Sequence, residues 1–164
     1  MTDRLQIYRV DLEAFVPTAK SGEGARLYGG RWNSPGLPVI YCAQSLALAV
    51  LEILVHASTP QERADARVWF ALSLPPSAVT TVRMRSLPHG WNDPVSIHPS
   101  TMALGDTWLR SNKSLALCVP SALLPGEWNY VLNVNHPHFR KSLRWSKPHA
   151  VQLDPRLVNG SRAD

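Results

Sequence analysis

The chain has 164 residues, of which 45% are hydrophobic and 18% are charged. This composition excludes a disordered chain and is typical of one globular domain with a sizeable core. Seventeen Lys and Arg residues against twelve Asp and Glu give a net charge of +5, which suits a negatively charged substrate or partner. The fourteen prolines predict many turns and few long helices.

Hydropathy along the chain argues against membrane and secretory classes. The longest uninterrupted apolar run, Leu46–Leu51, is far too short to span a bilayer. The first part of the chain carries charges and no apolar signal segment. We therefore expect a cytoplasmic protein that does not bind membranes. In that reducing compartment Cys42 and Cys118, which form no CxxC pair, are expected to be small buried hydrophobic residues.

Short strands are predicted more often than helices. In chain order, strands are expected at 5–10, 38–43, 68–72, 80–84, 115–119, 128–132 and 149–153, and helices at 46–57, 101–110 and 139–143. Ser45 is the expected N-cap of the first helix, which should stop before Pro60. The glycine-rich segment 21–36 and the proline-rich segment 86–100 are expected to be loops.

This order of elements disfavours regular βαβ winding, because strands outnumber helices. It favours an α+β fold: a single domain with mixed, bent β-sheets and a few short helices. We expect the domain to span residues 1–158 and a C-terminal tail to occupy 159–164.

The glycine-rich segment 21–36 lacks both standard phosphate-binding fingerprints. Leu27 stands where a dinucleotide fingerprint needs its third glycine, and Gly30 stands where a P-loop needs lysine. Arg26 and Arg31 are nevertheless able to grip a phosphate, because a guanidinium donates paired hydrogen bonds. A surface loop with solvated arginines is equally consistent with this spacing.

Glu52 interrupts the apolar run of the first predicted helix. Ser45, Ala49, Glu52 and His56 recur at helical spacing and form one narrow polar stripe. A solvated helix edge explains this stripe, because glutamate is usually exposed. The alternative is that the stripe lines a cleft in which Glu52 meets a cationic substrate or transition state.

Other polar and aromatic side chains give weaker signals. Tyr41, at the end of an apolar strand, is able to stack on a flat heterocycle but is also a plausible core residue. Ser121 lacks the GxSxG context of a hydrolase nucleophile. The segment 136–138 has no second ligand pair at metal-site spacing, so no metal site is expected.

Residues 128–153 carry four basic side chains and no acidic one: Arg140, Lys141, Arg144 and Lys147. The run matches no known nucleic-acid-binding pattern, and a solvated basic face explains it. An alternative for the whole chain is a non-catalytic basic binding module that contacts nucleic acid or an acidic protein partner through this run.

Several short sequence blocks follow one another along nearly the whole chain, and their order matches that of a known family. The most specific is Gly29-Gly30-Arg31-Trp32-Asn33, and the others are Val39–Ala43, Ser45–Glu52, Gly105–Leu109, Val119–Ala122, Glu127–Tyr130, Asn133–Phe139 and Asp154–Leu157. In this pattern the chain resembles the RES-domain family, the toxin half of RES–Xre toxin–antitoxin pairs. It departs from the family at Val134, where proline is common.

The resemblance implies an ADP-ribosyltransferase-like fold and an enzyme that consumes NAD⁺ and inhibits growth. The reaction would be NAD⁺ hydrolysis, phosphorolysis or ADP-ribosyl transfer, with no metal. The Arg, Glu and Ser of the family name map to Arg31, Glu52 and Ser121. The implied partner is an Xre-like helix-turn-helix antitoxin, while a homodimer and a protein target of ADP-ribosylation stay open.

The resemblance also assigns roles within that chemistry. Cleavage of the nicotinamide–ribose bond develops positive charge on the ribose, which a fixed carboxylate stabilises. Glu52 is the candidate carboxylate, Tyr41 would stack on nicotinamide, and Arg31 would bind the pyrophosphate or the nicotinamide-side phosphate. These three are the expected catalytic residues. Further expected NAD⁺-binding residues are Ser121, Asn129, Arg26, Tyr28 and Arg9.

Overall fold

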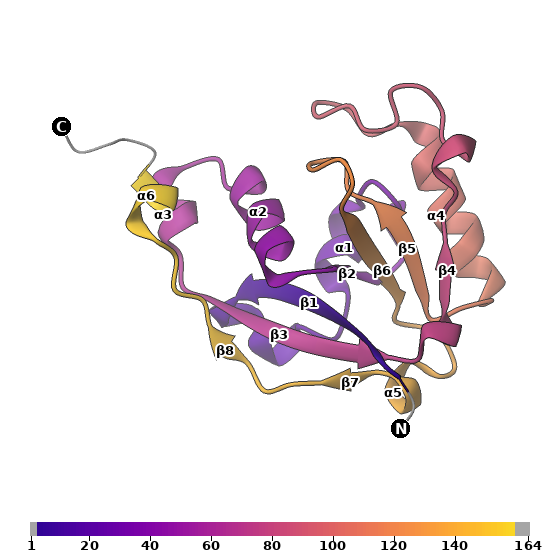
Figure 1. Cartoon of the computed structure of the whole chain (residues 1–164), viewed down its shortest axis with the longest axis horizontal. Helices are drawn as coiled ribbons and strands as arrows, with labels where there is room; N and C mark the ends of the chain where they lie inside the picture. The colour runs from indigo at the N-terminus through magenta and orange to yellow at the C-terminus, as the bar shows by residue number, and fades with distance from the viewer. Residues whose placement is uncertain (1–2, 160–164) are drawn as a thin grey trace.

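One curved, mixed sheet of eight strands organises residues 3–159, the part of the chain that the computed structural model describes (Figure 1). The strand order is β4-β5-β6-β2-β1-β3-β7, and β8 pairs with β3. Only β4 and β5 are parallel, and every other pair is antiparallel. The strands are β1 (Leu5–Leu12), β2 (Val39–Ala43), β3 (Arg67–Leu74), β4 (Val79–Thr81), β5 (Ala116–Pro120), β6 (Trp128–Asn133), β7 (Arg144–Trp145) and β8 (His149–Ala150).

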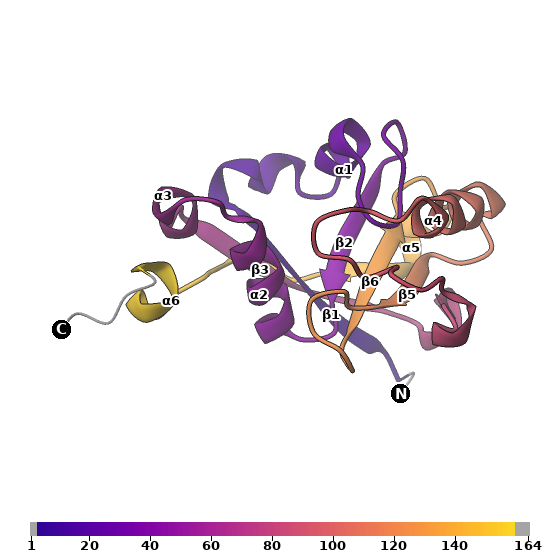
Figure 2. The ribbon, with the colours of Figure 1, turned by 90° about the horizontal axis from the view of Figure 1, so that it is seen from above.

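Short helices flank this sheet. The two long helices, α2 and α4, lie on opposite sides of the β2–β6–β5 strands in both views (Figure 1, Figure 2). The α-helices are α1 (Glu23–Tyr28), α2 (Leu46–His56), α3 (Pro60–Ala64), α4 (Pro99–Ser111), α5 (Phe139–Ser142) and α6 (Pro155–Asn159), and the 3-10 helices are η1 (Glu13–Thr18), η2 (Pro76–Ala78) and η3 (Met84–Ser86). No helix within residues 3–159 combines the length and hydropathy needed to cross a bilayer.

The predicted α+β class, with a mixed, bent sheet and few helices, is confirmed. Three local predictions were wrong. The segment 21–36 is not all loop, because α1 lies in it. The expected stop before Pro60 is right, because α2 ends at His56; Pro60 starts a separate helix, α3, where the Thr59 side chain and Glu62 form a capping box. The strand expected at 80–84 is Val79–Thr81, and the one expected at 149–153 is only His149–Ala150.

The expected tail at 159–164 falls largely outside the described residues. Asn159 is the last residue of α6, and 160–164 are not described.

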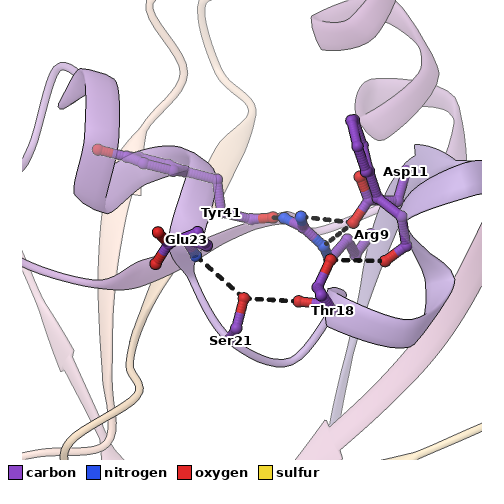
Figure 3. Close-up of polar contacts among 7 residues, drawn as sticks. Arg9, Asp11, Thr18, Ser21, Glu23 and Tyr41 are labelled. Carbon is purple, nitrogen blue, oxygen red and sulfur yellow. Dashed lines mark hydrogen bonds and ion pairs between the residues drawn. The ribbon is translucent and has the colours of Figure 1, made fainter.

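The sheet splits between β1 and β2. β1 pairs with β3 along its whole length, but it pairs with β2 only at Tyr8 and Ala43. Beyond that point a side chain takes the place of the backbone hydrogen bonds between the two strands: Arg9 Nη1 donates to the Tyr41 carbonyl at 3.2 Å (Figure 3). Asp11 orients the guanidinium, because its Oδ2 accepts from Arg9 Nε and Nη2 at 3.0 and 2.6 Å. Arg9 therefore holds β1 and β2 together where their backbones separate.

Both cysteines are buried and free, as the sequence predicted. They lie on β2 and β5, and each is in register with Tyr130 on the strand between them. Burial raises the pKa of the Cys42 thiol to about 12. The folded chain therefore holds this proton far more tightly than an unfolded chain does.

Because of Cys42, we expect the free energy of unfolding to decrease as the pH rises into the alkaline range. Its folded pKa is raised, so its contribution to stability is fully present below the ordinary thiol pKa of about 8.5 and is lost as the pH rises through the folded value. In that window the free energy of unfolding should fall by up to about 1.4 kcal/mol per pH unit for this group. Urea titrations across the window measure the slope. Cys42→Ala should have a shallower slope, and an unchanged slope would contradict this origin.

Candidate active site

Glu52 lies on α2 at the edge of the helix face that packs on the sheet. Ser45 caps the helix as predicted, because its side chain accepts a hydrogen bond from Leu48 N at 3.1 Å. Leu48 and Ala49 are buried in one apolar cluster with β1 and β2 residues. Since residues three and four positions apart share a helix face, this packing leaves Glu52 half-buried beside the sheet.

Two side chains from distant segments hold the Glu52 carboxylate. Its Oε1 accepts a hydrogen bond from Asn129 Nδ2 of β6 at 2.6 Å and from Ser121 Oγ, just after β5, at 3.2 Å. The Ser121 oxygen accepts in turn from the backbone N–H groups of Leu123 and Leu124, both at 3.1 Å. The serine proton is therefore directed at Glu52, and the carboxylate is fixed by two donors.

The side-chain amide of Asn129 has one atom, its oxygen, that is left without a hydrogen-bond partner in the described chain. Its Oδ1 is buried and accepts no hydrogen bond from the described residues. A buried acceptor without a donor is uncommon and costs free energy. A ligand hydroxyl or N–H group beside Glu52 would satisfy it.

Arg31 lies in the backbone segment between α1 and β2. Its Nη1 donates to the Trp91 carbonyl at 2.5 Å and its Nη2 to the Asp93 carbonyl at 2.9 Å. Burial lowers the pKa of the guanidinium, and the nearby negative charges of Asp93 and Glu52 oppose that shift. It makes no ion pair within 4 Å with any carboxylate of the described chain. Arg31 is thus a partly desolvated cation bound only to neutral carbonyls.

Tyr41 fastens the segment that carries Arg31. Its hydroxyl accepts a hydrogen bond from Trp32 N at 3.1 Å and donates to Asn33 Oδ1 at 2.7 Å. Asn33 is fully buried, and its Nδ2 donates to the carbonyls of Ala25 and Leu37 at 2.9 and 3.1 Å. Because its hydroxyl is committed to this network, only the half-buried ring of Tyr41 remains for contact with a ligand.

Asp106 on α4 fastens the same segment from the other side. Its carboxylate accepts from Ser34 N at 2.9 Å and from Ser34 Oγ at 2.6 Å. Neither Asp106 nor Asn33 was predicted as a functional residue. Both lie in sequence blocks that carry the resemblance to the family, Gly29–Asn33 and Gly105–Leu109, but these blocks do not identify their hydrogen-bond partners.

Tyr41→Phe should lower the free energy of unfolding by about 1–3 kcal/mol, because it leaves the Trp32 N–H and Asn33 Oδ1 buried without this partner. Urea denaturation measures the change. Tyr28→Phe is the matched control: Tyr28 is 85% exposed, so its stability should change by less than about 0.5 kcal/mol. Equal stability of the two variants would show that the hydroxyl network is not formed.

The predicted site residues therefore fall into two groups. Glu52, Ser121 and Asn129 are in direct contact. The Glu52 charge acts on the Arg31 guanidinium, and the Tyr41 hydroxyl binds Trp32 N in the segment that carries Arg31. The other three make no contact with Glu52: Arg26 pairs with Glu23 at 2.6 Å on the surface of α1, and Tyr28 is exposed. Arg9 binds Asp11 and touches the site only at the Tyr41 carbonyl.

Metal ligands are not gathered in the described part of the chain. No group of three or more His, Cys, Asp or Glu within residues 3–159 is arranged to hold an ion. The chemistry available at the site is that of a fixed carboxylate, two hydrogen-bond donors and a guanidinium.

Fold and site together define a small α+β protein with a carboxylate–arginine site on a split sheet. The chain belongs to the RES domain family, whose model matches residues 6–154, so the resemblance read from the sequence is confirmed.

Three known proteins extend the comparison. Toxin Res of Photorhabdus laumondii is 37% identical over 158 residues, 95% of this chain and 99% of the relative. Prs ADP-ribosylating toxin of Sphingobium sp. is 30% identical over 161 residues, 96% and 98% of the two chains. The crystal structure of the M. tuberculosis MbcT-MbcA toxin-antitoxin complex aligns with a TM-score of 0.77 at 23% identity, over 100% of this chain and 92% of that one, and so shows the same fold.

Proposed function

We propose that this chain is an NAD⁺-consuming toxin that cleaves the nicotinamide–ribose bond. The observation that carries this proposal is the Glu52 carboxylate, which Ser121 and Asn129 hold in place and whose charge acts on the Arg31 guanidinium. Two full-length relatives are named toxins, one of them ADP-ribosylating, and NAD⁺ is the usual donor of an ADP-ribosyl group.

A fixed carboxylate is suited to this bond cleavage. The electron pair of the nicotinamide–ribose bond leaves with the nicotinamide, which becomes neutral, and positive charge develops on the ribose. Glu52 stabilises that charge, and its two donors keep it oriented so that little reorganisation is needed during the reaction. Its second oxygen, Oε2, accepts no hydrogen bond from the described residues and is available to the ribose. Water, phosphate or a protein side chain then attacks the ribose carbon.

The remaining groups of the site fit the rest of NAD⁺. The unpartnered Asn129 Oδ1 suits a ribose hydroxyl or the carboxamide N–H of nicotinamide. Arg31 carries five N–H donors, and the two loop carbonyls leave the others for the pyrophosphate. The ring of Tyr41 is then the candidate to stack on the nicotinamide.

An antitoxin is the partner that this proposal includes. The solved structure with the same fold is described as a toxin-antitoxin complex. We therefore propose that this toxin acts in the cytoplasm and is neutralised by an antitoxin, with an Xre-like helix-turn-helix protein as the expected type. Co-expression with the candidate antitoxin should restore growth and yield a stable complex on size exclusion, which also reports whether the toxin is a homodimer.

Nicotinamide release from NAD⁺ by the purified, antitoxin-free chain tests the reaction. Product analysis with and without phosphate separates free ADP-ribose from its phosphorylated form, and labelled NAD⁺ added to lysate reveals a modified protein. Any one of these products supports the proposal and identifies the acceptor. If NAD⁺ stays intact and no protein is labelled, the proposal is refuted.

The basic run is the feature on which the alternative function depends. Arg140, Lys141, Arg144 and Lys147 are all exposed, on and around α5 and β7, and the sheet order separates β7 from the β2–β6 strands of the Glu52 site. A binding module would show affinity that falls steeply with salt and no NAD⁺ turnover.

A further inference from the structure

A surface hollow lies beside Arg31 and outside the Glu52 cluster. Its volume is about 540 Å³, and all its lining residues belong to the segment 84–94, which includes η3 and the loop before α4. None of the three residues of the Glu52 cluster, Glu52, Ser121 and Asn129, lines this hollow, so it is separate from that cluster.

The rim of the hollow is attached to the Arg31 segment. The two guanidinium hydrogen bonds of Arg31 end on the carbonyls of Trp91 and Asp93, which both line the hollow. The Trp91 ring packs against the Trp32 ring at a centroid distance of 6.0 Å. These contacts fix the hollow with respect to the guanidinium.

The loop also has its own internal support. Asp93 Oδ1 accepts hydrogen bonds from the backbone N–H groups of Val95 and Ser96, both at 2.8 Å. This closes a turn directly beyond the hollow. The rim therefore has a defined shape even though most of its side chains are exposed.

Three features are connected through Arg31: the Glu52 cluster, the guanidinium itself and the hollow. The Glu52 charge acts on the guanidinium, no residue of the Glu52 cluster lines the hollow, and the hollow adjoins the carbonyls on which Arg31 ends. In NAD⁺ the scissile ribosyl bond, the two phosphates and the adenosine follow in this order. With the ribosyl bond at Glu52 and the phosphates at Arg31, the adenosine reaches the hollow.

We propose that the hollow binds the adenosine end of NAD⁺, with Trp91 against the face of the base and Asn92 and His89 at its edge. This subsite rests on the proposed function and gives that function its dinucleotide specificity. An aromatic ring supplies a stacking surface, and an amide side chain is able to pair with the amino and ring nitrogens of adenine. Leu87 and Pro88 add apolar wall to the same hollow.

Steady-state kinetics with two substrates test the subsite. Nicotinamide mononucleotide contains the scissile bond but no adenosine, so it serves as the internal control. Trp91→Ala should raise the KM for NAD⁺ by roughly 5- to 150-fold, the effect of losing one base–aromatic stack, with little change in kcat. Asn92→Ala should raise it by about 5-fold, as expected for one lost hydrogen bond. Neither variant should change kcat/KM for the mononucleotide.

Inhibition by adenosine monophosphate gives a second measurement, because this compound contains the adenosine part of NAD⁺ and no scissile nicotinamide–ribose bond. It should compete with NAD⁺ in the wild-type chain, and Asn92→Ala should raise its inhibition constant by the same factor as the KM. Asn92 is exposed and makes no side-chain hydrogen bond within residues 3–159, so this variant should fold normally even if Trp91→Ala disturbs the Trp32 contact. Val95→Ala, on the same loop but outside the hollow, is the matched control and should behave as wild type.

The outcomes separate the two proposals. A wild-type chain that cleaves neither substrate refutes the proposed function itself. A wild-type chain that cleaves NAD⁺, but whose Trp91 and Asn92 variants keep the NAD⁺ KM or lose activity on both substrates equally, refutes the subsite and leaves the function standing. Failure of adenosine monophosphate to compete also overturns the subsite.

Discussion

Glu52→Gln should lower kcat for nicotinamide release from NAD⁺ by at least about a hundredfold, while the chain stays folded. The substitution removes the negative charge that is proposed to stabilise the ribosyl cation. Its amide oxygen still accepts from Asn129 and Ser121, so the contacts between α2, β6 and the β5–β6 turn are retained. The expected result is therefore a loss of catalysis without a loss of structure.

Glu13→Gln is the matched control for this experiment. Glu13 is exposed on η1, and the same loss of charge there should leave turnover unchanged. Urea denaturation of both variants should give nearly wild-type midpoints, because no buried donor is left without an acceptor. If Glu52→Gln retains turnover, the catalytic role of Glu52 is wrong; if it unfolds, the carboxylate is required for structure.

Most of the sheet could be predicted from local patterns, because apolar alternation and turn residues are local properties. The strands β1, β2, β3, β5 and β6 all fall where this pattern placed them, and Ser45 caps α2 as its position suggested. Errors arose where the signal depends on neighbours. α1 begins after Gly22, whose φ of 68° lets the chain turn into a helix in a segment that glycine content alone assigns to a loop.

The site was harder to predict, because its members are distant in the sequence. Glu52 is 69 residues from Ser121 and 77 from Asn129, and only the packing of α2 on the sheet brings them together. Residue type and spacing left open whether Glu52 faced solvent or a cleft; the resemblance to a family selected the second interpretation. The hollow at 84–94 had no signal at all, since its shape depends on two backbone carbonyls that Arg31 binds.

The polar stripe on α2 shows, within a single helix, that spacing in the sequence does not predict the surroundings of a side chain. Ser45, Ala49, Glu52 and His56 share a helical spacing, but their surroundings differ. Ala49 is buried, His56 is exposed, and Glu52 lies between these extremes against β6. Periodicity fixes the direction of a side chain about its own helix, whereas its chemical use depends on what packs opposite it.

Among the described glycines, Gly105 leaves the least room for a side chain, and its substitution is expected to have the largest effect on stability. A Cβ atom on Gly105 of α4 would lie 1.7 Å from the carbonyl oxygen of Trp32 and 2.6 Å from its carbonyl carbon. Both are backbone atoms, so no side-chain rotation relieves the clash, and α4 must move away from the Arg31 segment. Gly105→Ala should therefore lower the free energy of unfolding by about 3 kcal/mol or more, despite the better helix propensity of alanine.

Gly24→Ala is the control that separates a steric effect from a helix-propensity effect. Gly24 also lies in a helix, α1, but a Cβ there meets no heavy atom within 4 Å. It should be neutral or stabilise the chain by up to about 1 kcal/mol. Urea denaturation of the pair measures the contrast. Where Gly105→Ala still folds, displacement of Asp106 from Ser34 should also slow NAD⁺ turnover, because the segment that carries Arg31 is then less firmly held. Equal stability of the two variants would show that α4 does not pack on Trp32 this closely.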